Sequence, residues 1–77
     1  MTNELKLLGW PKWLPWEFGQ RVTKRTGSSW TGQICGWYTT TRTEIGFCVE
    51  SENEPGSVHL YPMKALMLLQ PPVQDKE

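Results

Sequence analysis

The clearest alternation of apolar and polar positions runs over residues 44–51, EIGFCVES. Ile45, Phe47 and Val49 are its large apolar side chains, and the positions between them are acidic, small or a cysteine. A period of two indicates a β-strand that presents one face to a hydrophobic core. We therefore predict a strand here, with these three side chains on one face.

Four other runs rich in β-branched or large apolar residues predict the remaining strands. They lie at residues 20–24, 30–38, 57–61 and 66–70, with one helical turn at 63–65. Polar turn clusters that contain glycine or proline separate some of these runs, at 26–29 and 52–56. Gly32 and Gly36 lie inside the second run, where glycine often marks a bulge, a bend or a close approach of two backbones.

Five short strands at intervals of about 8–12 residues favour an all-β fold of the small-barrel type. A five-stranded SH3-like barrel suits a core of this size. The alternative is a five-stranded OB-like barrel, which requires longer strands and a helix for which the chain has too few residues.

The patterned region occupies residues 17–70, and two different segments flank it. Residues 1–16, MTNELKLLGWPKWLPW, form a Trp- and Pro-rich N-terminal arm that cannot continue as a regular helix past Pro11. We expect this arm to be flexible or loosely packed; packing on the barrel, binding of a partner and anchoring at a membrane interface are the alternatives. Its net charge of +1 argues against strong membrane binding. Residues 71–77, PPVQDKE, form a polar C-terminal tail.

A chain of 77 residues allows at most one domain, with a small core. Its 8 basic and 8 acidic side chains cancel, which argues against nucleic acid or a membrane as a partner held by overall charge. Cys35, Cys48 and a single histidine are too few for a four-ligand zinc site within one chain. The sequence has no signal-peptide pattern and no apolar stretch long enough to span a membrane. We expect a cytoplasmic protein with reduced thiols, in which oligomerisation supports the small core.

No familiar catalytic motif occurs in the chain. The nucleophile elbow, the P-loop and the Gly-rich dinucleotide motif are all absent. Glu50, Glu52 and Glu54 cluster at a strand end, where a solvated, solubilising edge is a simpler interpretation than an acid–base pair. Strand alternation places His59 with Tyr61 on one face of their strand and the neighbouring apolar residues on the other.

Three basic residues lie close together in the sequence, Arg21, Lys24 and Arg25. They form either a solvated strand end or a small anion site for phosphate or carboxylate. One chain offers too few charges to hold a nucleic acid strongly, whereas several copies around one cavity would concentrate them. Trp30 and Trp37 lie in a predicted strand, where packing in a core or an interface is the expected role.

Four short motifs together make a specific signal. They are W-x-G-Q-I at 30–34, G-W-Y at 36–38, V-E-S at 49–51 and P-G-S-V-x-x-Y-P at 55–62. In sequence and spacing these motifs resemble the type II dihydrofolate reductases, small plasmid-borne enzymes that confer trimethoprim resistance. The resemblance is ungapped over roughly residues 18–66 and leaves out the arm and the tail.

This resemblance implies a shared active site. In the family an SH3-like barrel assembles into a 222-symmetric homotetramer, and one central pore is lined four times by the same residues. NADPH and dihydrofolate lie side by side in the pore, where a hydride passes between them. The resemblance therefore implies an NADPH-dependent, trimethoprim-insensitive dihydrofolate reductase whose partners are dihydrofolate and further copies of itself.

The resemblance also assigns roles to individual residues. Lys24 matches a lysine near the pore mouths. Its positive charge attracts the cofactor phosphates and the glutamate tail of the folate. Five consecutive residues match the floor and walls of the pore, which bind the cofactor: Ser57, Val58, His59, Leu60 and Tyr61. Among these, the resemblance gives His59, Leu60 and Tyr61 the substrate-binding and catalytic roles. Interface and packing tryptophans match Trp30 and Trp37.

Three positions depart from the family pattern. His59 stands where the family has a glutamine beside the stacked ligand rings, and Leu60 stands where it has an isoleucine. An imidazole still stacks and hydrogen-bonds, and four copies near one axis disfavour simultaneous protonation, so we expect neutral His59 at pH 7. Glu54 replaces a histidine before P-G-S, so acid-driven dissociation through that position is not expected.

Two other functions remain open on the sequence alone. One is a non-catalytic SH3-like module that binds peptide or nucleic acid, because small barrels serve many functions. The other is a phage- or cassette-encoded accessory protein whose Trp-rich arm binds a partner.

Overall fold

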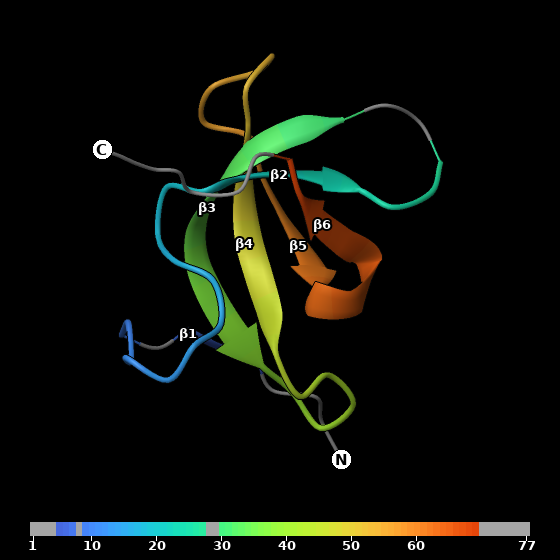
Figure 1. Cartoon of the computed structure of the whole chain (residues 1–77). Coiled ribbons are helices and arrows are strands. Elements are labelled where there is room, and N and C mark those ends of the chain that lie inside the picture. The colour runs from blue at the N-terminus through green and yellow to red at the C-terminus, as the bar shows by residue number, and fades with distance from the viewer. Residues whose placement is uncertain (1–4, 8, 28–29, 70–77) are drawn as a thin grey trace, which may run out of the picture.

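The computed structural model describes residues 5–7, 9–27 and 30–69, and over these residues the protein is all-β (Figure 1). The elements in chain order are β1 (Lys6–Leu7), β2 (Arg21–Lys24), β3 (Thr31–Thr39), β4 (Gly46–Ser51), β5 (Val58–Pro62), the 3₁₀ turn η1 (Met63–Ala65) and β6 (Leu66–Leu68). All five predicted strands and the predicted helical turn are present, with ends that move by one or two residues. In the described part of the chain, no helix has the length and apolar character needed to cross a membrane.

The strands form one antiparallel sheet in the order β5-β4-β3-β2-β6, with β1 added to β3. Long strand β3 pairs with β2 near its start and with β1 at its end, as Figure 1 shows. The sequence pattern did not predict β1, because two residues are too short a run for a period to be recognised. Lys6 and Leu7 instead obtain their strand conformation by pairing with Thr39 and Tyr38.

One face of the sheet supplies the hydrophobic core. Phe47 and Val49 are fully buried, which confirms the alternation in 44–51, while Ile45 is only half-buried at its end. Val22, Ile34 and Leu66 complete the set of fully buried large side chains. Each such side chain contributes about 1.5–3 kcal/mol by leaving water.

Residues 9–16 of the N-terminal arm pack against this core. Leu14 is 7% exposed and belongs to the core cluster. The Trp16 ring stacks on Phe47 with 5.2 Å between centroids, and Trp10 approaches Phe47 at 6.3 Å. This close packing differs from the loosely packed arm expected from the prolines. Residues 1–4 and 8 of the arm, and the predicted tail at 71–77, lie outside the described residues.

The two glycines inside β3 have the roles that the sequence suggested. The β3–β4 register shifts between Ile34 and Gly36, so Cys35 is the extra residue of a β-bulge. Gly32 lies so close to β4 that an added Cβ would be 2.6 Å from the backbone oxygen of Glu50. The bulge interrupts the β3–β4 ladder at Cys35, and at Gly32 the two strands lie too close for a side chain between them.

Candidate functional site

Four of the residues singled out in the sequence meet at one end of the sheet. Trp30 contacts His59 and Tyr61 edge-on, with ring centroids 5.2 Å and 5.4 Å apart. The His59 and Tyr61 rings are nearly parallel, with an interplanar angle of 22° and centroids 6.2 Å apart. Lys24 places its Nζ 5.5 Å from the centroid of the Tyr61 ring, a cation–π distance. We refer to Lys24, Trp30, His59 and Tyr61 as the aromatic cluster.

Strand register explains why two members of the cluster share a face. His59 pairs with Val49 and Tyr61 pairs with Phe47 across the β4–β5 ladder. Directly opposed residues of an antiparallel pair point to the same side of the sheet. Because Phe47 and Val49 face the core, His59 and Tyr61 lie on that same side, further toward the edge.

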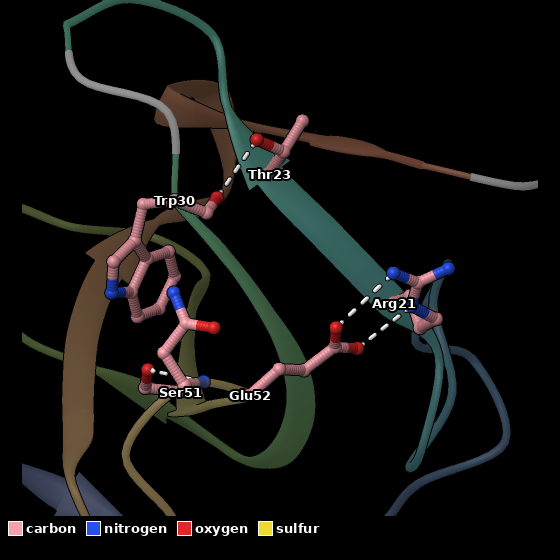
Figure 2. A network of polar contacts seen from close by, with 6 residues as sticks. Arg21, Thr23, Trp30, Ser51 and Glu52 are labelled. Atoms are coloured by element: carbon pink, nitrogen blue, oxygen red, sulfur yellow. Dashed lines mark hydrogen bonds and ion pairs between the residues drawn. The ribbon is translucent and has the colours of Figure 1, made fainter.

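A hydrogen bond from β2 positions Trp30. Thr23 donates its hydroxyl to the backbone oxygen of Trp30 at 2.8 Å, as Figure 2 shows. This bond ties the residue before β3 to the neighbouring strand, next to the Thr23–Thr31 pair. The backbone of Trp30 is therefore fixed from β2, while its indole reaches the rings of β5.

Arg21 and Lys24, which the sequence grouped as basic neighbours, contact different partners in the structure. Arg21 binds Glu52 through two hydrogen bonds, from Nε at 2.7 Å and from Nη2 at 3.1 Å (Figure 2). The guanidinium holds the pKa of the Glu52 carboxyl below its usual value, and the carboxylate raises the pKa of Arg21. Lys24 approaches Tyr61 instead, so the three cations do not converge on one anion.

The outer face of β5 is apolar and exposed. Val58 is 48% exposed and Leu60 is 43% exposed, opposite the face that carries His59 and Tyr61. Within the described residues β5 pairs with β4 alone, so its other edge has unpaired backbone groups. Exposed edge strands with apolar side chains are sites of association in proteins.

Ser57 immediately precedes β5 and its side chain contacts His59. Its hydroxyl lies 3.2 Å from Nε2 of the His59 ring, within hydrogen-bond distance. Its backbone oxygen accepts a 2.9 Å hydrogen bond from the Ser51 amide, which fixes the preceding turn. All five predicted residues at 57–61 therefore lie on or beside β5, with their side chains on alternate faces.

Trp37 lies apart from the aromatic cluster, although the sequence grouped it with Trp30. It is 6% exposed and donates its indole N–H to the backbone oxygen of Gly9. The Trp13 ring meets it edge-on at 5.4 Å. Trp37 thus packs between the core and the arm within one chain, a contact that no local pattern in the sequence signalled.

Two of the three glutamates at the acidic strand end, Glu50 and Glu52, bind groups of the same chain. Glu50 accepts a 2.7 Å hydrogen bond from the Gly56 amide, and Ser51 caps the turn by accepting from the amides of Asn53 and Glu54. Since Glu52 is bound to Arg21, two of the three carboxylates have partners that shape this end of the sheet. In the described part of the chain, no group of three His, Cys, Asp or Glu side chains could hold a metal ion.

Comparisons with known proteins identify the family of the chain. The family described as R67 dihydrofolate reductase matches residues 7–70. Two proteins of Escherichia coli, both named dihydrofolate reductase type 2, are 54% and 56% identical to this chain over 48 residues. That region spans 62% of this chain and 62% of each relative. Because the family match includes the aromatic cluster and every described strand but one residue of β1, the chain belongs to the R67 dihydrofolate reductase family.

Proposed function

We propose that this protein is a type II dihydrofolate reductase that reduces dihydrofolate with NADPH and is insensitive to trimethoprim. The observation that carries the proposal is the aromatic cluster beside the exposed apolar strand β5. In a single chain the aromatic cluster lies on an open surface. It becomes an enclosed binding site only when the surface of another chain covers it. The activity named for the two similar proteins supports the same conclusion.

The proposed assembly is a homotetramer of SH3-like barrels with 222 symmetry and one central pore. A 77-residue chain buries a smaller fraction of its unfolded-chain surface than a larger domain does, so association adds stability that a single core lacks. The open edge of β5 and its exposed Val58 and Leu60 supply the surface for it. Trp30 is half-buried and serves as an interface residue in this proposal, whereas Trp37 supports the subunit from inside.

The residues of β5 fit a flat, negatively charged cofactor. NADPH supplies the hydride when it is bound. Its rings fit beside the near-parallel rings of His59 and Tyr61, and Lys24 provides a positive charge for its phosphates. Ser57, Val58 and Leu60 offer backbone groups along an edge that no strand of the described chain covers.

Catalysis in this proposal rests on position rather than on a protein acid. Dihydrofolate binds against His59, Leu60 and Tyr61, with its glutamate carboxylates near Lys24. The aromatic cluster contains no carboxyl group, so the proton for the reaction comes from solvent. Holding two flat reactants in reacting geometry removes much of the entropic barrier, and symmetry-related copies of β5 perform that role. We place this enzyme in the cytoplasm, with Cys35 and Cys48 as the free thiols seen in the structure.

Two measurements on one sample test the proposal. NADPH oxidation in the presence of dihydrofolate is followed with and without trimethoprim, and the molar mass is measured by light scattering. We expect a tetramer that turns over at the same rate with trimethoprim present. A monomer would refute the pore, and a tetramer without turnover would favour a binding module instead.

Variants then locate the site. Lys24→Met should weaken NADPH and dihydrofolate together, because each loses a charge partner. Lys12→Met is the matched control, since Lys12 is an exposed lysine of the arm far along the chain from β5. Equal affinities for both ligands in Lys24→Met and the control would remove Lys24 from the site.

A further inference from the structure

A concave site lies outside the aromatic cluster and shares no residue with it. A cavity of about 470 Å³ opens between the turn that precedes β4, the η1 turn and the end of the arm. Trp16, Ile45, Met63 and Leu66 form apolar lining, and Arg25, Arg42 and Lys64 bring three cations. We call this cavity the basic groove. None of the residues assigned to the pore lines it.

The apolar floor of the basic groove is held by the fold. Trp16 is stacked on fully buried Phe47, and Leu66 is itself fully buried. Met63 donates its amide to the backbone oxygen of Ile45 at 3.0 Å, which joins the η1 turn to the start of β4. A ligand would therefore meet an existing apolar surface rather than have to open one.

The charged walls are equally well supported. The backbone amide of Arg25 donates to Ala65 at 3.0 Å, which holds the end of β2 beside the η1 turn. The turn that carries Arg42 is closed by two hydrogen bonds of 2.9 Å between Thr40 and Thr43. Hydrogen bonds thus fix the backbone segments that carry Arg25 and Arg42.

Among the described residues, the cations that line the basic groove outnumber its acids. In the part of the chain that the structure describes, the ion pair is Arg21–Glu52, and Arg25, Arg42 and Lys64 have no carboxylate partner. Glu44 is the one acid of the lining, so the groove has an excess of two positive charges. This excess contrasts with the zero net charge of the whole chain.

We propose that the basic groove binds small aromatic carboxylates. A flat ring suits the apolar floor of Trp16, Ile45 and Met63. A carboxylate suits the guanidinium groups of Arg25 and Arg42, whose planar forks match its geometry. A fully hydrated anion would gain nothing from the apolar floor, and a neutral ring would gain nothing from the cations. The combination therefore selects molecules that carry both parts.

Naphthoate is the probe that tests this site, and naphthylmethanol is its uncharged analogue. Each is titrated into the full chain labelled with ¹⁵N, and amide and indole shifts are followed by NMR. We expect saturable binding of naphthoate with shifts at Trp16, Ile45 and Met63, and much weaker binding of the alcohol. Equal binding of the two probes, no saturable binding of naphthoate, or shifts confined to the aromatic cluster would overturn the proposal.

Charge variants give a second readout. Arg42→Gln and Lys64→Gln are exposed substitutions that should leave the fold intact, and each should weaken naphthoate binding by about two- to fivefold, as exposed charge pairs do. Lys12→Gln removes an exposed charge outside the basic groove and should leave the affinity unchanged. Equal affinities in all three variants would refute the assignment. Saturating NADPH should not displace naphthoate, which distinguishes this groove from the pore whether or not the pore proposal holds.

Discussion

Gly32→Ala is a single-methyl change whose effect can be worked out from the structure. Gly32 pairs with Val22 on one side and Ser51 on the other, so it lies between two strands. A Cβ at this position would lie 2.5 Å from Cγ1 of Val49 and 2.6 Å from the backbone oxygen of Glu50. Ordinary contacts of this kind are about 3.5–4.0 Å, and a backbone oxygen cannot rotate away. Strands β3 and β4 must therefore move apart.

Overpacking of this kind costs about 1–3 kcal/mol of folding free energy. At about 0.05–0.15 kcal/mol per residue, a chain of 77 residues has a total stability of about 4–12 kcal/mol. The substitution therefore removes a large share of the stability without abolishing folding. A loss of about 2 kcal/mol corresponds to a Tm lower by roughly 10 °C for a domain of this size.

Urea unfolding followed by tryptophan fluorescence measures the loss. Both variants are measured at one protein concentration, because the proposed tetramer would make the midpoint depend on concentration. Gly9→Ala is the matched control, since nothing lies within 4 Å of its added Cβ. The control should be unchanged or slightly more stable, because alanine restricts the unfolded chain. Gly32→Ala should unfold at clearly lower urea with an unchanged m value. Coincident midpoints for the two variants would refute the close-approach argument.

Three further outcomes follow from the burial and charges described above. Leu14→Ala should destabilise the fold by about 2–5 kcal/mol in urea unfolding, because Leu14 is a core residue of the arm; a change no larger than that of an exposed residue would show that the arm is dispensable. Burial raises the pKa of the Cys35 and Cys48 thiols, so Ellman's reagent should modify them far more slowly in folded than in unfolded protein, and equal rates would contradict this. Arg21 lowers the pKa of Glu52 in the folded state, so the pair stabilises the fold above the ordinary carboxyl pKa of 4.5, and this contribution is lost as the pH falls through the lowered value. Glu52→Gln should flatten the acid side of the stability–pH curve, and an unchanged acid slope would count against it.

Local pattern in the sequence was sufficient to predict every strand of the sheet except β1, and to place His59 and Tyr61 on one face. The period of two in 44–51 depends on consecutive residues, and the structure places Phe47 and Val49 in the core as that period requires. The same alternation placed His59 with Tyr61, and the β4–β5 register confirms it. Motif spacing alone also led to the family that the comparisons support.

Tertiary structure decided which distant residues meet. The packing of Leu14 and the bond from Trp37 to Gly9 join segments about 30 residues apart in the chain, and prolines in the arm give no local sign of them. In the same way, pairing across the sheet separated Arg21 from Lys24, which the sequence had grouped, and brought Glu52 to one and Tyr61 to the other. Periodicity reports the face on which a side chain lies. The contacts of a side chain depend on the register between paired strands and on the path of the loops and the arm. Neither can be read from the residues next to it in the sequence.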